Sequence, residues 1–376
     1  MVNSINLEKR VSLAPMTTMG VGGSANYLVR VKDGNDLQNA VAWAAAEKQS
    51  LLILGEGSNM IVSDTGWDGI VIKMENTGVE VVETSSGCVE ICVQAGMDWD
   101  DLVAYTVEHD WWGIENMSLI PGTVGACPVQ NVGAYGQECR KVITSVKVYD
   151  TLKREWRVLT NNDCRFSFRT SIFNTTDKGR YIIISVNFKL SKLPSPCLTR
   201  IAVKNRLREK GCENDDQAAI RDAVIELRTS GKLLPKPNTL GSSGTFFRAS
   251  LVPHNLVLRL IFTTWRNLGT KTACKLLACT IKYNTREGTK VPSRLLIEAC
   301  RLNGTKIRSA ELFSVNPAVI ATHAIPPPQA ADILTLIQQV RSTVYAKTGL
   351  EVPVEPTLVG FSADDMNEAF SLSQQS

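Results

Sequence analysis

The spacing of apolar residues in the first third of the chain predicts a strand, a helix and a second strand. Residues 27–31 are extended in character, and residues 51–54 form a short apolar run typical of a buried strand. Between them, residues 36–48 carry apolar side chains at helical spacing, and Asp36 falls in the first turn, where a negative charge stabilises a helix. The positions on that face are Leu37, Val41 and Ala44. This order of elements predicts a small parallel sheet.

The middle third predicts one helix and an antiparallel sheet. Residues 98–110 are expected to form a helix that Asp98 caps. The side chains along one side of this helix are Leu102, Tyr105 and His109. Residues 142–149 and 155–159 alternate in the manner of an antiparallel hairpin, and residues 181–190 alternate again. The inward positions of this last strand are Val186, Phe188 and Leu190. This part of the chain is therefore expected to be an α+β domain.

Two helical patterns follow a proline-containing linker at residues 191–196. Residues 214–230 carry one apolar stripe and end at Gly231, and residues 329–347 carry a longer stripe that ends at Gly349. The two stripes are Ile220, Val224 and Leu227, and Ile333, Ile337, Val340 and Val344.

Residues 251–289 are apolar and basic, and their pattern does not define a structure. Core helices are the default interpretation of this segment. A surface for a partner is the alternative.

Composition narrows the class of protein. A length of 376 residues exceeds one typical core and predicts two or three domains. The formal net charge of +4 does not indicate a nucleic-acid-binding protein. We expect no signal peptide and no membrane span, because no suitable apolar run is present. Ten cysteines without a C-x-x-C spacing, together with three histidines, predict reduced thiols in a cytoplasm and no zinc site.

Three glycine-rich segments are the candidates for chemistry. Gly20-x-Gly22-x-x-Ala25 matches a dinucleotide fingerprint in form, but an extended segment follows it where a helix is required, so we reject that interpretation. The turn Gly55-Glu-Gly-Ser-Asn59 follows a predicted strand and can present N–H groups to a diphosphate. The segment 119–138 contains four glycines and almost no charge, which suits a backbone that folds tightly against a ligand.

Together these segments resemble the flavin-dependent UDP-N-acetylenolpyruvoylglucosamine reductases of peptidoglycan synthesis. They are similar to the family's T-x-x-x-G-G element, its L-G-E-G-S-N loop and its P-G-x-V-G…P-x-Q-N-x-G-A-Y-G-x-E segment. The resemblance continues at residues 164–173, 241–247 and 354–360, so it spans most of the chain. It is closer in the flavin-binding part than in the substrate-binding part.

The resemblance implies an α+β fold with a two-subdomain FAD-binding module of the PCMH type and a C-terminal α+β substrate domain. We place the subdomains at 1–66 and 67–195 and the substrate domain at 200–350. Residues 351–376 are expected to form a strand and tail that return to the FAD module.

The resemblance also implies FAD and NADPH as cofactors. The expected pyrophosphate contacts are Gly55, Glu56, Gly57, Ser58 and Asn59. The expected contacts of the flavin ring and ribityl chain are Gly122, Thr123, Gly125, Ala126, Ala134 and Tyr135. The implied partners are a UDP-sugar and NADPH, with no nucleic acid and no membrane, and the chain is expected to be a monomer.

In the reaction that the resemblance implies, NADPH reduces FAD, and hydride then passes to C3 of an enolpyruvyl ether while C2 is protonated. Arg169 matches the family arginine that would stabilise the developing charge, because a guanidinium stays charged and can bind a carboxylate in a bidentate manner. Glu355 matches the family's C-terminal acid, which would hold a proton or orient Arg169. Thr245 stands where the family has the serine that donates the proton, and its added methyl stiffens the side chain.

Departures from the family pattern lie on the substrate side. The family's Lys-Leu-Pro-Asp-Pro appears as 232–237 with an added residue, and its F-F-K-N-P appears as 246–250 without the Asn. Arg200 replaces a lid tyrosine. Lys232, Arg200 and Arg248 are the cations that could contact a diphosphate substrate. Two alternatives therefore stay open beside the reductase: a non-catalytic or substrate-altered flavoprotein that retains FAD, and a flavin oxidase.

Overall fold

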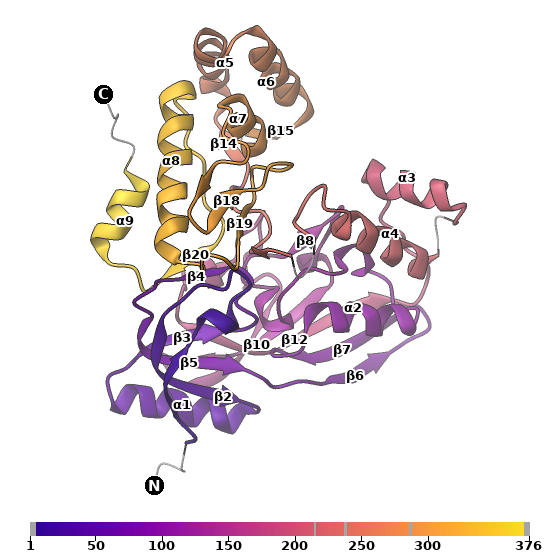
Figure 1. Cartoon of the computed structure of the whole chain (residues 1–376). Coiled ribbons are helices and arrows are strands. Elements are labelled where there is room, and N and C mark those ends of the chain that lie inside the picture. Colours follow the sequence, from indigo (N-terminus) through magenta and orange to yellow (C-terminus); the bar gives the residue numbers. More distant parts are fainter. Residues whose placement is uncertain (1–4, 214–215, 237–238, 286–287, 372–376) are drawn as a thin grey trace. The chain divides into compact units, whose positions relative to one another are not determined.

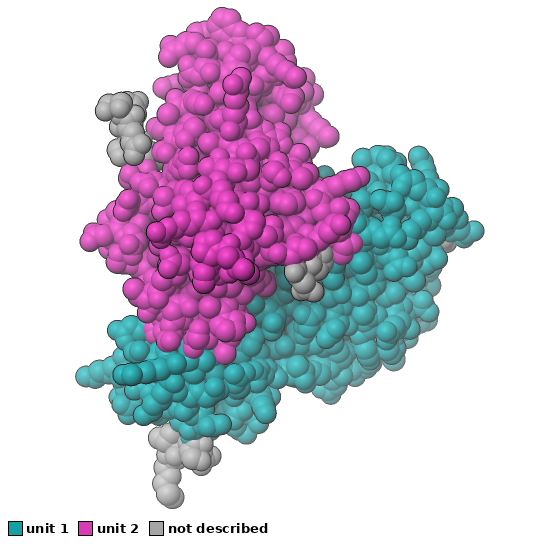
Figure 2. Space-filling model, viewed as in Figure 1, with its two compact units in different colours: residues 1–11, 25–57, 68–228 teal, residues 12–24, 58–67, 229–376 magenta. Residues whose placement is uncertain are grey.

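The computed structural model describes residues 5–213, 216–236, 239–285 and 288–371 (Figure 1). The chain forms two compact units, which Figure 2 colours separately. Unit 1 comprises residues 1–11, 25–57 and 68–228, and unit 2 comprises residues 12–24, 58–67 and 229–376. The chain therefore passes into unit 2 twice before the last third completes it. Short 3-10 helices are η1 Ala14–Met16, η2 Glu115–Met117, η3 Val124–Ala126, η4 Cys139–Lys141 and η5 Ile172–Asn174.

The first sheet of unit 1 has the strand order β1-β2-β5-β3. Its elements are β1 Glu8–Ser12, β2 Ser24–Val31, β3 Ser50–Leu54 and β5 Trp67–Met74, with helix α1 Gly34–Ala46 between β2 and β3. Strands β3 and β5 pair in parallel, but the two strands predicted from the sequence, β2 and β3, are not neighbours because β5 lies between them. Asp33 caps α1 by accepting hydrogen bonds from the N–H groups of Asn35 and Asp36. The extended β2 begins within the 20–25 glycine pattern, which confirms that this pattern does not open a dinucleotide-binding helix.

The second sheet of unit 1 is antiparallel and has the order β11-β10-β12-β7-β6. Its strands are β6 Val79–Thr84, β7 Cys88–Gln94, β10 Ile143–Asp150, β11 Glu155–Thr160 and β12 Tyr181–Ser191. The predicted hairpin and the inward positions Val186, Phe188 and Leu190 are confirmed, because β10 pairs with β11 and these three side chains are buried. Ile182, Ile183 and Ile184 are buried as well, so the first half of β12 is covered on both faces.

Helix α2 Trp99–Glu108 begins at its predicted cap, where the Asp98 carboxylate accepts from the N–H groups of Asp100 and Asp101. The side that the sequence identified is only in part the buried face of the helix. Leu102 is buried, but His109 is exposed at the end of the helix and stacks on Tyr105 with ring centroids 4.2 Å apart. The buried face is instead Trp99, Leu102, Val103 and Thr106. Helical spacing alone did not distinguish an exposed aromatic side chain from a buried one.

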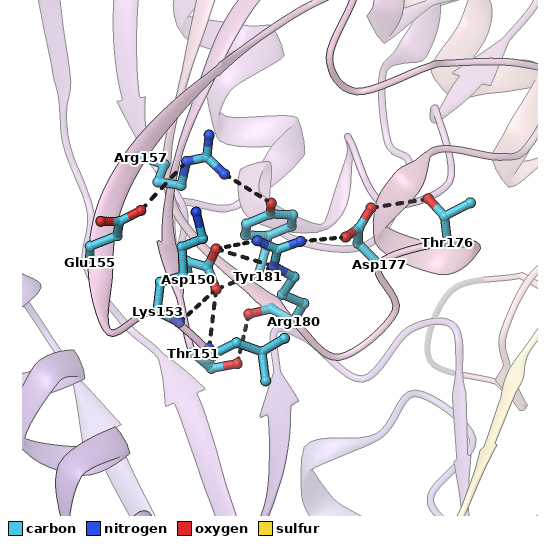
Figure 3. A network of polar contacts seen from close by, with 10 residues as sticks. Asp150, Thr151, Lys153, Glu155, Arg157, Thr176, Asp177, Arg180 and Tyr181 are labelled. Carbon is cyan, nitrogen blue, oxygen red and sulfur yellow. Dashed lines mark hydrogen bonds and ion pairs between the residues drawn. The ribbon is translucent and has the colours of Figure 1, made fainter.

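An ion-pair network joins the β10–β11 turn to the start of β12 (Figure 3). The fully buried Asp150 carboxylate accepts from Nη2 of Arg180 at 2.7 Å and from its Nε at 3.1 Å. It also accepts from the N–H groups of Leu152 and Lys153. Arg180 in turn pairs with Asp177 at 3.0 Å. The guanidinium of Arg180 lowers the pKa of Asp150, so this carboxylate stays charged inside the fold.

Two helices complete unit 1, α3 Ile201–Lys210 and α4 Gln217–Thr229. They bury Val203, Leu207, Ile220 and Val224 with Trp112 in a small cluster. This confirms two of the three predicted stripe residues, while Leu227 is half-buried and packs against the cluster; residues 214–215 of the predicted helix lie outside the described residues. Arg221 of α4 binds Asp100 of α2 through two hydrogen bonds of 2.6 and 2.9 Å, so α4 is fixed to the helix that precedes the glycine-rich segment.

Unit 2 is built around helix α8 Ala330–Thr348, whose four predicted stripe residues are all buried. Gly349 ends this helix in the left-handed conformation, as the sequence predicted. Its other helices are α5 His254–Leu268, α6 Thr270–Lys282, α7 Ser293–Ala299 and α9 Ala363–Phe370. Its strands are β4 Met60–Val62, β13 Gly241–Ser242, β14 Ser250–Val252, β15 Asn284–Thr285, β16 Gly288–Val291, β17 Lys306–Ile307, β18 Ala310–Leu312, β19 Ile320–Thr322 and β20 Thr357–Val359. They form the sheets β13-β19-β18-β17 and β14-β16-β15 and the parallel pair β20-β4.

Candidate active site

The turn after β3 is packed closely against the second glycine-rich segment of unit 1. A Cβ at Gly55 would lie 2.7 Å from the Thr123 hydroxyl oxygen, which is closer than carbon and oxygen can approach without a shift. Lys73 donates to the Gly55 carbonyl at 2.5 Å and pairs with Glu56 at 3.0 Å. Gly57 has a φ of 60°, which favours glycine. The turn is therefore held in one conformation by residues that lie far from it in sequence.

The residues of this turn divide between the two units. Gly55, Glu56 and Gly57 belong to unit 1, whereas Ser58 and Asn59 belong to unit 2. The Asn59 carbonyl accepts from the Thr357 N–H at 3.0 Å, next to the parallel pairing of β4 and β20. The Asn59 backbone is thus fixed by the C-terminal strand of the same unit.

In the segment 122–126, several N–H groups are already used by the protein. Gly125 donates to the Ala95 carbonyl at 2.8 Å, and Ala126 donates to the Thr123 carbonyl at 3.0 Å. A Cβ at Gly125 would lie 2.7 Å from the Ala95 Cβ. Gly125 therefore allows close packing of backbone on backbone. Thr123 is buried next to Gly55, and Gly122 has a φ of 133°.

Ala134 and Tyr135 lie on a tight hairpin. Strand β8 Gly133–Ala134 pairs with β9 Gln137–Glu138, and the two residues between the strands both have positive φ, 46° at Tyr135 and 99° at Gly136. Positive φ at both central residues is the geometry of a two-residue hairpin turn. Burial raises the pKa of the Tyr135 phenol, so its hydroxyl stays protonated at neutral pH. Asn116 fixes the turn by donating to the Tyr135 carbonyl at 3.0 Å.

Arg169 is attached to this hairpin. Its Nη2 donates to the Gly133 carbonyl at 2.9 Å, and its backbone has a φ of 56°, an uncommon conformation for a residue with a side chain. Asn131 strengthens the link, because its amide donates to the Ser167 carbonyl at 2.8 Å and to Glu138 at 3.1 Å. The structure thus brings Arg169 together with the 133–136 hairpin within unit 1. A strained residue held by several contacts is typical of a functional position.

Arg228 lies outside the sequence motifs but belongs to the same part of unit 1. Its Nε donates to the Leu119 carbonyl at 3.1 Å, at the start of the glycine-rich segment. Burial lowers the pKa of this guanidinium, and Tyr135 and Asp100 oppose that effect. A partly buried cation in this part of unit 1 is a candidate contact for an anionic ligand. Its only sequence signal was a position near the end of the predicted 214–230 helix.

In unit 2, Thr245 and Glu355 lie on neighbouring segments. The Glu355 N–H donates to the Phe246 carbonyl at 2.9 Å, and Phe247 forms a bridge with Val354. Phe246 and Phe247 are fully buried, so they fix the exposed Thr245 beside them. Gly244 has a φ of 77°, and a Cβ there would meet nothing within 4 Å. The space beside Thr245 is therefore open to a ligand.

Two buried hydroxyls near Thr245 have no hydrogen-bond partner in the described part of the chain. They belong to Thr18 and Ser243, and the Thr18 carbonyl accepts from the Ser242 N–H. A buried polar group without a partner costs free energy, so a ligand that satisfied these hydroxyls would bind more tightly. Both residues lie within the glycine-rich sequence motifs, but the motifs gave no role to either side chain.

The three predicted substrate cations are not gathered in one place by any contact that we observe. Arg200 is the exposed residue before α3 in unit 1. Lys232 is exposed in unit 2, and Arg248 of the same unit donates its N–H to the Pro353 carbonyl at 3.1 Å. Only Arg248 is therefore tied to the strand region that carries Glu355.

The family comparisons give the class of protein first. Residues 25–158 match the family of FAD binding domains. These residues lie almost wholly in unit 1 and include Gly55, Thr123 and the 133–136 hairpin. The tight contact of Gly55 with Thr123 and the positive φ angles of Gly57 and Gly122 fit a backbone that approaches a diphosphate and a planar ring. This chain is an FAD-binding flavoprotein.

The particular family follows from the rest of the chain. Residues 236–359 match the C-terminal domain of UDP-N-acetylenolpyruvoylglucosamine reductase. The reductase of Neisseria gonorrhoeae is 34% identical over 349 residues, which cover 92% of this chain and 96% of that protein. The reductase of Alcanivorax borkumensis is 31% identical and covers 92% of this chain. The chain belongs to the UDP-N-acetylenolpyruvoylglucosamine reductase family.

A solved structure agrees with the fold. The crystal structure of the reductase from Thermus caldophilus matches 95% of this chain and all of that chain with a TM-score of 0.63 and 20% sequence identity. The predicted α+β fold, with an FAD-binding part followed by a C-terminal domain, is therefore confirmed.

Proposed function

We propose that this protein reduces UDP-N-acetylglucosamine enolpyruvate to UDP-N-acetylmuramate with NADPH, as a step in the synthesis of peptidoglycan precursors. The observation that carries the proposal is family membership over nearly the whole chain, at 34% identity to a reductase of that name. Net chemistry adds one hydride to C3 and one proton to C2 of the enol ether, so one NADPH is oxidised for each double bond reduced.

FAD, when bound, supplies the hydride-carrying chemistry between the two substrates. We propose that Gly55, Glu56, Gly57, Ser58 and Asn59 hold its pyrophosphate. Gly122, Thr123, Gly125, Ala126, Ala134 and Tyr135 would hold the ring and ribityl chain. Because the N–H groups of Gly125 and Ala126 already bond to carbonyls, we assign these two residues a role in shape rather than in hydrogen bonding to the cofactor. Arg228 is added to this set as a cation that is bonded to the Leu119 carbonyl at the start of the glycine-rich segment.

Arg169 would stabilise the negative charge that develops on the substrate beside its carboxylate. The residue suits this role because its guanidinium stays charged and the bond to Gly133 fixes its direction. A preorganised cation lowers the barrier more than a mobile one, since it does not reorganise during the reaction.

Thr245 would donate the proton to C2, and Glu355 would orient or recharge this hydroxyl. The two residues are neighbours in unit 2, and the open space beside Gly244 leaves room for substrate. We expect Thr245→Ser to react faster than the natural protein, because the smaller side chain turns more freely. We expect Thr245→Ala to lose nearly all substrate-driven reoxidation of the reduced flavin, because general acid catalysis typically contributes 10²–10⁴-fold.

Anaerobic flavin absorbance tests the proposal. The purified protein should be yellow, lose its band near 450 nm with NADPH, and regain it without oxygen only when the enolpyruvyl sugar nucleotide is added. Recovery with oxygen alone would identify an oxidase instead. A full rate in Thr245→Ala would assign the proton to another group while leaving the reductase activity in place.

A substrate-altered flavoprotein is the second candidate, and the departures on the substrate side favour it. Arg200 is exposed, and of the three expected cations we observe a bond to the strand region that carries Glu355 for Arg248 alone. Protein that binds FAD and is bleached by NADPH, but is not reoxidised by the enolpyruvyl sugar nucleotide, would establish this candidate.

We also propose that the protein works in the cytoplasm with a UDP-sugar and NADPH as its partners. All ten cysteines are free thiols, which suits a reducing compartment. Among the described residues, no helix has the length and apolar character needed to cross a bilayer. The division at 1–66, 67–195, 200–350 and 351–376 stays a prediction.

A further inference from the structure

Helices α5 and α6 form a hairpin in unit 2 that we call the basic hairpin, residues 254–282 (Figure 1). A single residue, Gly269, joins the two helices. Only Leu260 and Thr264 of α5 and Ala273 and Leu276 of α6 are buried. The hairpin is therefore attached to unit 2 by a narrow stripe, and most of its surface is exposed.

Each helix carries a second apolar stripe that faces outward. On α5 the side chains at helical spacing are Leu258, Phe262 and Trp265, which are 78%, 59% and 50% exposed. On α6 they are Leu277 and Ile281, which are 49% and 79% exposed. Positions separated by three, four or seven residues share one helix face. These faces differ from the faces that pack against unit 2.

The two outward stripes meet at the turn of the hairpin. The indole N–H of Trp265 donates to the Thr270 hydroxyl at 3.3 Å. Thr270 precedes Leu277 by seven residues and so shares its face of α6. The rings of Phe262 and Trp265 lie 5.9 Å apart. Phe262, Trp265 and Thr270 thus lie together near the turn, and the outward stripes continue from there to Leu258 on α5 and Ile281 on α6.

This surface is flanked by positive charge without acid. No Asp or Glu occurs between residues 227 and 286 of the sequence. Five cations lie on the two helices, Arg259, Arg266, Lys271, Lys275 and Lys282. Within the described part of the chain, none of these five forms an ion pair. Their charge is therefore available to an anionic partner.

We propose that the basic hairpin binds the surface of a membrane that contains anionic lipids. A helix that exposes Trp, Phe and Leu on one face and Lys and Arg beside it inserts its apolar side chains at the level of the headgroups. The cations then lie near lipid phosphates, which attract them. Aliphatic side chains that are nearly 80% exposed suit insertion into a fluid phase, whereas a protein partner would need a matching concave surface. Pairing with a second copy is opposed by the like charges on both surfaces.

Vesicle binding tests the proposal. Protein would be sedimented with vesicles of phosphatidylcholine that contain 30% phosphatidylglycerol and with vesicles of phosphatidylcholine alone. We expect at least tenfold stronger binding to the anionic vesicles, and loss of most of it at high salt because the attraction is screened. Equal or absent binding to both vesicle types would overturn the proposal.

Charge variants test whether the lysines of the hairpin, rather than lysines anywhere on the protein, account for binding to the membrane. Each cation near an anionic membrane contributes about a fivefold factor, so Lys271→Glu with Lys275→Glu should weaken binding by at least about 25-fold. The matched control changes two exposed lysines of unit 1, Lys153→Glu with Lys178→Glu, and should bind within threefold of the natural protein. Equal losses in both pairs would overturn the assignment to the hairpin.

Apolar variants and quenching test insertion. Leu258→Ser should weaken binding at least tenfold, whereas Leu152→Ser, at a position of similar exposure (75%) in unit 1, should not. Lipids brominated in the acyl chain should quench Trp265, measured as the difference between the natural protein and Trp265→Phe. Absence of this difference would overturn insertion. Dimerisation that Leu258→Ser abolishes would assign the surface to a second copy instead.

Discussion

Replacing Gly55 by alanine should weaken FAD binding, because the added methyl has no room. Its Cβ would lie 2.7 Å from the Thr123 hydroxyl oxygen and 3.4 Å from its methyl carbon. Thr123 is only 3% exposed and branched at Cβ, so it cannot rotate away freely. Overpacking of this kind costs about 1–3 kcal/mol. If the turn shifts to relieve the overlap, FAD must restore it on binding, and the dissociation constant rises by about 5- to 150-fold.

The assay is titration of FAD-free protein with FAD, followed by the quenching of flavin fluorescence. Gly87→Ala is the matched control, because a Cβ at Gly87 meets nothing within 4 Å and should change the dissociation constant less than twofold. Combining Gly55→Ala with Thr123→Ala should cost less than the sum of the single changes, since the second change removes the obstructing hydroxyl. A Gly55→Ala protein that binds FAD as tightly as the Gly87→Ala control would refute the reasoning.

Two further predictions concern stability. Asp150→Asn should lower the free energy of unfolding at pH 7 by about 1–2 kcal/mol, because it removes the charge that Arg180 binds, while the partly exposed Arg180 remains solvated. Because the pKa of Asp150 is lowered in the folded protein, its contribution to stability is present above the unfolded-state pKa near 4 and is lost as pH falls through the folded-state pKa. In urea unfolding, the difference in free energy between the natural protein and the variant should therefore become smaller in acid. A difference that did not change with pH would contradict this account. Asp98→Ala should lower Tm through loss of about 1 kcal/mol, since both capping bonds to α2 disappear, while the neighbouring exposed Asp101→Ala serves as control.

Helices and strands with one apolar face could be predicted from the sequence. The stripe of α8 has a single period, and all four of its predicted residues are buried. The cap at Asp98 and the β10–β11 hairpin depend on neighbouring residues, so local pattern was enough to find them.

The basic hairpin could not be predicted in the same way. Helix α5 has one wide apolar face, which includes the buried Leu260 and the exposed Leu258 and Phe262, so the sequence does not show which of these apolar residues pack against unit 2.

The other parts of the site could not be predicted because they depend on contacts between residues that are distant in the sequence. The approach of Gly55 to Thr123 and the bond from Arg169 to Gly133 join segments that only the fold brings together. Family resemblance had named these residues, and the structure adds what each one touches. Arg228 belonged to no motif, and its partial burial and its bond to Leu119 identify it as a candidate.

The parallel pairing of β4 with β20 has a consequence for biosynthesis. Residues 60–62 leave the ribosome almost 300 residues before Thr357, to which they are paired in the finished protein. Until then the nascent chain must carry an unpaired strand edge, which is a site for misassociation with other chains. We expect premature termination before residue 357 to yield aggregation-prone product, and we expect unit 2 to reach its native state only after synthesis has ended.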